Sequence, residues 1–128
     1  MDQETMNRLT DAEFKIMEVL WREGDCPAKH ISDVMSEKNG WNINSTYTLI
    51  KRCIAKGMIA RSEPGFVCHA LVSCEDVRRV ETEKLIDRVF DGSLDLLFTA
   101  LLGSKKLSQK QVRELQLRLA ELEGEEDV

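Results

Sequence analysis

The sequence predicts a mostly α-helical protein with a small β-hairpin, organised as an N-terminal winged helix-turn-helix followed by a C-terminal helical arm. Apolar residues recur at helical spacing along most of the chain. The spacing becomes strand-like only in two short runs, 58–62 and 66–72, which the turn Glu63-Pro64-Gly65 separates. Since three helical segments precede these strands, the order is that of a helix-turn-helix with a two-stranded wing.

The first helix is expected over 11–23. Thr10 and Glu13 are spaced as a capping box, in which each side chain accepts a hydrogen bond from the backbone amide of the other residue. The helix then presents one apolar stripe and stops at Gly24. Trp21 belongs to this stripe and is expected to pack in the core.

The second and third helices are expected over 28–38 and 43–56. Pro27 suits the first position of the second helix, because its missing N–H would have no partner there, and Asn39-Gly40 ends that helix. Asn42 is the candidate N-cap of the third helix. The buried face of the third helix is predicted to consist of Leu49, Ile50, Cys53 and Ile54.

Residues 73–128 predict a helical domain separate from the winged-helix domain of residues 1–72. One apolar stripe ends at Asp91-Gly92, and the following stretch, 94–102, is apolar on nearly all sides. A last helix then carries a seam of apolar residues at alternating spacings of three and four, namely Val112, Leu115, Leu119 and Leu122.

Length and composition exclude several classes of protein. A chain of 128 residues, 42% hydrophobic and 32% charged, can bury one modest core but has little room for a substrate cleft. No apolar run is long enough to span a membrane and the acidic start Met1–Glu4 is not a signal peptide, so we expect a cytoplasmic protein. Because the sequence holds no GxSxG, HExxH or glycine-rich phosphate loop, we expect neither an enzyme nor a cofactor.

The charged residues are distributed unevenly. The net charge of −5 argues against a nucleic-acid partner, but no acidic residue lies between Glu37 and Glu63. This acid-free segment contains the basic residues Lys38, Lys51, Arg52, Lys56 and Arg61. A basic segment inside an acidic chain favours a surface for phosphates, although an ordinary solvated face could carry the same residues.

The exposed side of the third helix is the candidate DNA-binding surface. A recognition helix places polar residues of its N-terminal half against base edges and holds phosphates with basic residues. Asn44 could pair with adenine, and Thr48 offers a hydroxyl and a methyl group to a base. The predicted contact residues are Asn42, Asn44, Ser45, Thr46, Tyr47, Thr48, Lys51, Arg52 and Arg61. The alternative from another class is a winged helix that docks a protein partner and does not touch DNA.

The arm is predicted to form a homodimer. A stretch such as 94–102 needs more apolar surface than a three-helix arm supplies, and a dimer would read two half-sites related by a two-fold axis. The predicted interface residues are Leu85, Val89, Leu94, Leu97, Phe98, Leu101, Val112, Leu115, Leu119 and Leu122. The alternative is a helical hairpin packed within one chain.

A thiol- or metal-responsive regulator is a further alternative, which rests on Cys68, His69 and Cys74. Their spacing matches no standard zinc pattern, and adjacent residues of a strand point to opposite faces, so no metal site is predicted. Cys26 and Cys53 lie beside apolar residues and are expected to be small core residues.

Several short motifs, spread over about residues 8–123, occur together in a specific order. They are Thr10-Asp11-Ala12-Glu13-Phe14, Val19-Leu20-Trp21, Trp41-Asn42, Ser45-Thr46-Tyr47-Thr48-Leu49-Ile50-Lys51-Arg52, Lys56-Gly57-Met58-Ile59, Phe90-Asp91-Gly92-Ser93-Leu94 and Leu107-Ser108. In this order and spacing the chain resembles the penicillinase-repressor family, which contains the β-lactamase and methicillin-resistance repressors.

That resemblance implies a homodimeric repressor of double-stranded DNA, bound to a dyad operator with TACA/TGTA-like half-sites. The controlled genes would be a β-lactamase or other antibiotic-resistance operon, and a membrane sensor-protease would belong to the signalling pathway. The resemblance also places Asn44, Ser45, Tyr47 and Thr48 at the base-reading positions.

The sequence departs from the family pattern in three places. The scissile Asn-Phe pair of the family falls on Ala100-Leu101 here, so the residues of the family's cleavage site do not carry over. The wing is shorter, and its tip, Glu63-Pro64-Gly65, has no basic residue for a phosphate. The CxC motifs of the copper-responsive branch are absent.

Overall fold

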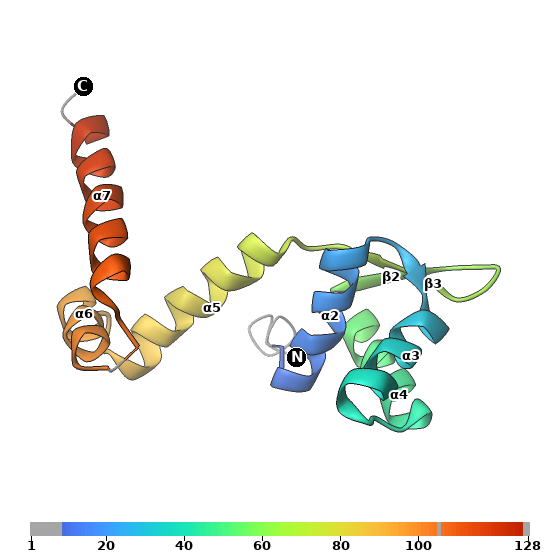
Figure 1. Cartoon of the computed structure of the whole chain (residues 1–128). Helices are drawn as coiled ribbons and strands as arrows, with labels where there is room; N and C mark the ends of the chain where they lie inside the picture. The colour runs from blue at the N-terminus through green and yellow to red at the C-terminus, as the bar shows by residue number, and fades with distance from the viewer. Residues whose placement is uncertain (1–8, 105, 127–128) are drawn as a thin grey trace. The chain divides into compact units, whose positions relative to one another are not determined.

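The computed structural model describes residues 9–104 and 106–126 (Figure 1). Its elements are α2 (Asp11–Glu23), β1 (Cys26–Pro27), α3 (Ala28–Asn39), α4 (Ile43–Ala55), β2 (Ile59–Ser62), β3 (Val67–Ala70), α5 (Cys74–Val89), α6 (Leu94–Gly103) and α7 (Gln109–Glu126). Three helices, a small sheet and three further helices confirm the predicted fold class. The segment Met1–Glu4, expected not to be a signal peptide, lies outside the described residues.

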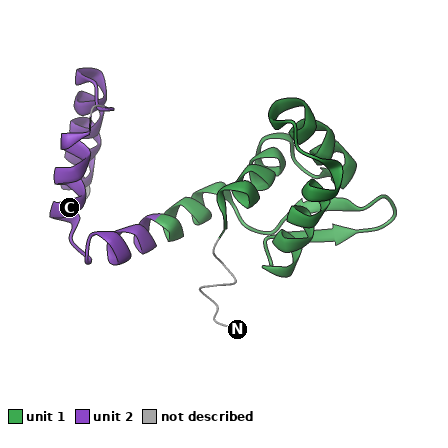
Figure 2. Cartoon of the chain, turned by 90° about the horizontal axis from the view of Figure 1, so that it is seen from below, with its two compact units in different colours: residues 1–81 green, residues 82–128 purple. Residues whose placement is uncertain are grey.

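The chain divides into two compact units, and the division falls within α5 (Figure 2). The first unit extends to Glu81 and contains α2, α3, α4, the sheet and the first half of α5. The second unit begins at Thr82 and contains the rest of α5 with α6 and α7. The boundary predicted from the sequence, between 72 and 73, lies just before the same helix.

The start of α2 is fixed by the predicted capping box. The Thr10 hydroxyl accepts a hydrogen bond from the Glu13 amide at 3.2 Å, and Oε1 of Glu13 accepts one from the Thr10 amide at 3.0 Å. Glu13 is also buried, and its Oε1 lies 2.6 Å from Nζ of Lys56, the C-cap residue of α4. Burial raises the pKa of this carboxyl, but the hydrogen bonds from Lys56 and Thr10 outweigh it, so the pKa lies below its ordinary value.

The sheet has three antiparallel strands in the order β1-β3-β2. The predicted hairpin is therefore present, with both of its strands shorter than expected, and β1 joins its other edge. The paired residues are Ile59 with Ala70, Ala60 with His69, Arg61 with Cys68, Ser62 with Val67, Cys26 with Cys68 and Pro27 with Val67. The sequence did not predict β1, because two residues, one of them a proline, have no strand periodicity. Pro27 is the N-cap of α3 and not its first residue.

The core of the first unit lies between α2, α3, α4 and the sheet (Figure 1). Its buried apolar side chains are Ile16, Met17, Val19, Leu20, Cys26, Ala28, Ile31, Met35, Ile50, Cys53, Met58, Ile59 and Cys68. The prediction that Cys26 and Cys53 belong to the core is confirmed, and Cys68 joins them. Burial raises the pKa of Cys53 to about 12 and that of Cys68 to about 11, so both thiols are protonated at neutral pH.

Trp21 packs against this core, as predicted. Its ring meets the ring of Phe14 edge to face, with centroids 5.3 Å apart and an interplanar angle of 70°. Its Nε1 donates a hydrogen bond to the Val72 carbonyl at 2.9 Å, so the one polar atom of the side chain is satisfied.

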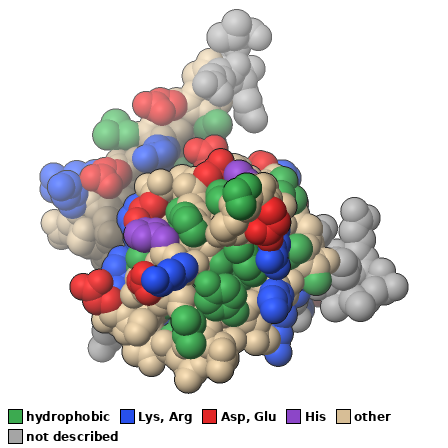
Figure 3. Space-filling view, turned by 90° about the vertical axis from the view of Figure 1, so that its right-hand side faces the viewer, with side chains coloured by type: hydrophobic (Ala, Val, Ile, Leu, Met, Phe, Trp, Pro, Cys, Tyr) green, Lys and Arg blue, Asp and Glu red, His purple; other side chains and the backbone are tan. Residues whose placement is uncertain are grey.

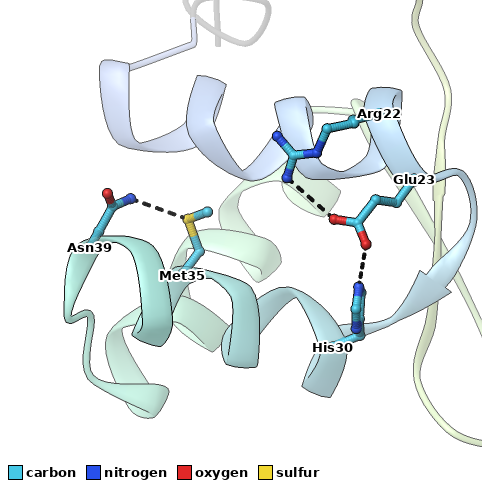
Figure 4. Close-up of polar contacts among 5 residues, drawn as sticks. All are labelled: Arg22, Glu23, His30, Met35 and Asn39. Atoms are coloured by element: carbon cyan, nitrogen blue, oxygen red, sulfur yellow. Dashed lines mark hydrogen bonds and ion pairs between the residues drawn. The ribbon is translucent and has the colours of Figure 1, made fainter.

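Polar contacts join the end of α2 to α3 (Figure 4). Glu23 lies 2.6 Å from Nε2 of His30 and 3.3 Å from Nη2 of Arg22. The hydrogen bond with His30 is the main reason that the pKa of Glu23 lies below its ordinary value. Farther along α3, Nδ2 of Asn39 donates to the sulfur of Met35 at 3.6 Å. Of these contacts, the one between Glu23 and His30 ties the end of α2 to the start of α3.

The second unit consists of well-capped helices with exposed apolar side chains. The Ser93 hydroxyl accepts from the Leu96 amide at the start of α6. Ser108 and Gln111 form a second capping box before α7: the Ser108 amide donates to the Gln111 side-chain oxygen at 2.9 Å, and the Gln111 amide donates to the Ser108 hydroxyl at 3.2 Å. No residue of α6 is buried. Within the described ranges, no helix combines the length and apolar character that a bilayer crossing requires.

Candidate nucleic-acid interface

The polar face predicted on the third helix lies on α4. Asn42 is its N-cap, and the side-chain oxygen of Asn42 accepts a hydrogen bond from the Asn44 amide at 2.8 Å. Asn44, Ser45 and Thr48 are exposed. The cap therefore fixes the first turn, and that turn presents a polar surface to solvent.

Two threonines of α4 bond back to the helix with different results. The Thr48 hydroxyl donates to the Asn44 carbonyl at 2.9 Å while the side chain stays exposed, which leaves its methyl group and oxygen lone pairs accessible. The Thr46 hydroxyl donates to the Asn42 carbonyl at 3.0 Å, and its side chain is fully buried. Thr46 must therefore be removed from the predicted contact residues, because it lies one turn before Ile50 on the core face of the helix.

Basic residues follow the polar turn along α4. Lys51 and Arg52 are exposed, and neither forms an ion pair with an acidic side chain in the described part of the chain. Lys56, which belongs to the same acid-free segment, has a side chain only 21% exposed and is bonded to Glu13. The segment thus offers DNA fewer charges than its composition suggests.

The predicted contact residue Arg61 lies at the wing in a set of close contacts. Its Nε is 2.6 Å from Oε1 of Glu63, and its guanidinium carbon lies 3.5 Å from the centre of the Phe66 ring. The other Glu63 oxygen accepts a hydrogen bond from the Phe66 amide at 3.1 Å. The hydrogen bond from Phe66, followed by the one from Arg61, holds the pKa of Glu63 below its ordinary value. The positive charge of Arg61 thus faces a carboxylate.

Tyr47 connects α4 to the wing. Its ring meets the Phe66 ring edge to face, with centroids 5.7 Å apart and an interplanar angle of 79°. Both side chains are half-buried. The sequence alone does not point to Phe66, because an aromatic residue just after a turn predicts a strand and gives no sign of a contact with a helix.

Ile43 is a second surface residue that the sequence pattern does not predict. Its side chain, in the first turn of α4, is 53% exposed. Helical spacing from Thr46 and Ile50 predicts burial at this position. Ile43 escapes burial because it is the first residue of the helix. It supplies an apolar group beside the polar residues.

The residues of α4 and the wing are mixed in character: Ile43 is an exposed apolar residue, Asn44, Ser45 and Thr48 are exposed polar residues, and Lys51 and Arg52 are exposed basic residues. One face of the molecule, seen in Figure 3, mixes hydrophobic side chains with Lys and Arg, acidic and histidine side chains. Such a surface offers both phosphate contacts and apolar contacts to bases.

The residues of the thiol- or metal-responsive alternative are engaged elsewhere. Nδ1 of His69 lies 2.9 Å from Oδ2 of Asp25, and Nε2 of His69 lies 2.7 Å from the Ser62 hydroxyl. Cys68 is buried and Cys74 is partly buried. Over residues 9–104 and 106–126, we find no group of three His, Cys, Asp or Glu side chains placed to hold a metal ion.

The predicted dimer-interface residues are largely exposed in the single chain. Leu97 and Val112 are half-buried. The other eight have exposed fractions of 36–58%; they are Leu85, Val89, Leu94, Phe98, Leu101, Leu115, Leu119 and Leu122. Leu96, Leu102 and Leu117, which lie outside the predicted set, are exposed as well.

Comparison with known proteins assigns the family. A family model described as penicillinase repressor matches residues 9–121. The chain belongs to this family. The resemblance that the sequence motifs indicated is thereby confirmed, over both the winged-helix unit and most of the arm.

Relatives in the penicillinase repressor family match nearly the whole chain. The methicillin resistance regulatory protein MecI of Staphylococcus aureus (strain N315) is 26% identical over 117 residues, which cover 90% of this chain and 94% of MecI. The penicillinase repressor of Bacillus licheniformis is 24% identical over 110 residues, which cover 84% of this chain and 86% of that repressor.

A solved structure has the same fold over about half of this chain. The DNA-binding domain of the repressor BlaI matches with a TM-score of 0.52 and 23% identity, covering 56% of this chain and 89% of that domain. The family and the fold together support a winged-helix transcriptional repressor.

Proposed function

We propose that the protein is a homodimeric transcriptional repressor that reads a palindromic operator in the major groove through α4. The exposed polar first half of α4, followed by Lys51 and Arg52, carries this proposal. In a helix-turn-helix the first residues of the recognition helix contact base edges, and basic residues hold phosphates. A surface that docks a protein partner would not need polar residues in the first half of the helix and basic residues after them.

Individual roles follow from exposure and chemistry. Asn44 is placed to bond an adenine edge, and Ser45 a base or a phosphate. Thr48 presents a methyl group and an oxygen acceptor, and Tyr47 presents a phenol. Ile43 adds an apolar contact suited to a thymine methyl group.

Backbone contacts are assigned to the remaining residues. Lys51 and Arg52 hold phosphates without an internal acidic competitor, whereas Arg61 must share its charge with Glu63. Asn42 contributes through the amides of the first turn that it caps, since helix N-termini bind anions.

The exposed leucines of α6 and α7 support the homodimer. Side chains such as Leu94 and Leu122, 57% and 58% exposed, leave apolar surface that a second copy would cover. A dimer doubles the phosphate contacts. With about six to ten phosphate contacts, the logarithm of the DNA association constant falls by roughly 0.9 per contact for each unit of the logarithm of the salt concentration.

The regulated genes are proposed from the relatives. Because these are named for methicillin resistance and for penicillinase, we propose a β-lactamase or other resistance operon with TACA/TGTA-like half-sites. A cytoplasmic location and a sensor-protease in the pathway belong to the same proposal. In this sequence Ala100-Leu101 stands at the place of the family's scissile Asn-Phe pair.

The experiment is selection of bound fragments from the genome of the host, using purified reduced protein at near-physiological salt. We expect one enriched palindrome upstream of a few operons. The matched control is the double variant Tyr47→Ala and Thr48→Ala, which should lose the enrichment and keep its helical circular dichroism. Weak, uniform retention of all fragments by the wild-type protein would overturn the proposal in favour of a protein-docking winged helix.

A further inference from the structure

The wing and α4 are joined by a stack of three side chains. The Arg61 guanidinium lies 3.5 Å from the centre of the Phe66 ring, and the Phe66 ring meets Tyr47 edge to face at 5.7 Å. Arg61 and Tyr47 are both proposed DNA contacts, one to the backbone and one to a base. Phe66 is the only member of the stack with no proposed DNA contact of its own.

The backbone of Phe66 is fixed from two sides. Its amide donates to Glu63 at 3.1 Å, and its carbonyl accepts from the amide of Ala28, the first residue of α3, at 2.9 Å. Its φ of +49° lies in the left-handed region, which a phenylalanine adopts only where the surrounding contacts hold it. The position of the ring is therefore set by the protein before DNA binds.

Tyr47 depends on this ring for its own position. Its side chain is half-buried, and a partly exposed side chain generally has more than one staggered rotamer open to it. An edge-to-face partner at 5.7 Å favours one of them. A side chain held in its binding rotamer loses less freedom when it meets a base, and this raises the affinity for the matching sequence over others.

We propose that Phe66 is a positioning residue that sets operator selectivity by holding the Tyr47 ring in its base-reading orientation. The inference rests on the proposed function. This role differs from a purely structural role of Phe66, because the effect of Phe66 depends on the Tyr47 side chain and changes which DNA sequences are preferred.

The test uses a pool of randomised DNA duplexes and sequencing of the bound fraction. Phe66→Leu should lower the ratio of preferred to random-sequence affinity by about two- to tenfold, the factor that corresponds to one edge-to-face contact. Affinity for random duplexes should stay within about twofold, since Lys51 and Arg52 are untouched. Phe66→Tyr, which keeps the ring, should restore the wild-type preference.

A matched control separates this effect from lost stability. Phe14→Leu removes one ring of the other edge-to-face pair in the same unit, the pair with Trp21, and should leave the preference unchanged. If Phe66→Leu shows no cooperative unfolding transition and is therefore not properly folded, Phe66→Met replaces it, because methionine fills a similar volume without a ring.

A double variant tests the route through Tyr47. In a Tyr47→Ala background, Phe66→Leu should cause no further loss of preference. Full additivity of the two losses, or an unchanged preference in Phe66→Leu alone, would overturn the inference while leaving the repressor intact. Absence of any preferred sequence for the wild-type protein would instead refute the proposed function.

Discussion

Nζ of Lys56 lies 2.6 Å from Oε1 of Glu13, which bonds the end of α4 to the first turn of α2. The Glu13 side chain is 1% exposed and the Lys56 side chain 21%. The same carboxylate oxygen completes the capping box of α2. One acidic side chain therefore starts one helix and anchors the helix proposed to contact DNA.

Glu13→Gln should lower the free energy of unfolding by about 1–3 kcal/mol. The variant loses the ion pair, but Lys56 can still reach water, so the loss stays below that of a fully buried pair. Lys56→Met should cost more, about 3 kcal/mol, because it leaves a buried carboxylate without its cation. Urea denaturation measures both. The control is Glu18→Gln, an exposed position of the same helix, and a loss there as large as at Glu13 would contradict the account.

The stability of the first unit should depend on pH through Glu13. Its folded pKa lies below the ordinary value of 4.5, so the folded state binds this proton more weakly than the unfolded state. The stabilisation is thus complete above pH 4.5 and is lost as the pH falls through the lower folded value. Urea midpoints measured from neutral pH to about pH 3 should fall less steeply in Glu13→Gln than in wild type. Parallel curves for the two proteins would refute the assignment.

Glu63→Gln should strengthen binding to random-sequence DNA. The change removes the negative charge beside Arg61, whose guanidinium then becomes available to a phosphate. The slope of log K against log salt should steepen by roughly 0.9 for each phosphate gained. The measurement is fluorescence anisotropy over a salt series, with Glu18→Gln as the control of equal charge change. An unaltered slope would mean that Arg61 does not approach the DNA backbone.

Substitutions on α4 should divide into two kinds. Tyr47→Ala and Thr48→Ala should relax sequence preference, with each lost base contact costing about 1–3 kcal/mol on the preferred site. Arg52→Ala should weaken binding to all DNA sequences alike and reduce the slope of log K against log salt by about one. Binding to preferred and scrambled duplexes distinguishes the two kinds. An equal loss of preference in all three variants would refute the assignment of roles.

The double variant Leu97→Asp and Leu101→Asp should be monomeric. Two carboxylates in the proposed interface would be desolvated on association, and operator affinity should fall at least about tenfold with the loss of one half-site. Sedimentation velocity gives the mass. Leu117→Asp is the matched control, since Leu117 is 66% exposed and lies outside the predicted seam. A dimer that survives the double change would place the interface elsewhere.

Local sequence signals predicted the elements that depend on local chemistry. The Thr10–Glu13 capping box and the Asn42 cap both form as expected. Each is made by residues no more than three positions apart, so their spacing contains the geometry. The family was also predictable, because its motifs extend over nearly the whole chain.

Contacts between distant residues could not be predicted in this way. Lys56 lies in the acid-free segment and is therefore expected among the surface charges. Its partner Glu13 lies 43 positions earlier, outside that segment. Likewise the sequence predicts Arg61 and Tyr47 as separate DNA contacts, and only folding brings Phe66 between them. Thr46 stands in a polar run, yet the orientation of α4 turns it inward. Pairings of this kind depend on the tertiary arrangement, which single-sequence periodicity does not contain.

The three buried cysteines, Cys26, Cys53 and Cys68, make transient opening of the folded core detectable. A protonated thiol inside the core reacts with an alkylating reagent only during the moments when the fold around it comes apart. Cys53, enclosed by α2 and α4, would therefore report rare excursions of the helical layer, and Cys68 those of the sheet. The timing of these events could be measured by mass spectrometry on the native chain, with no label introduced.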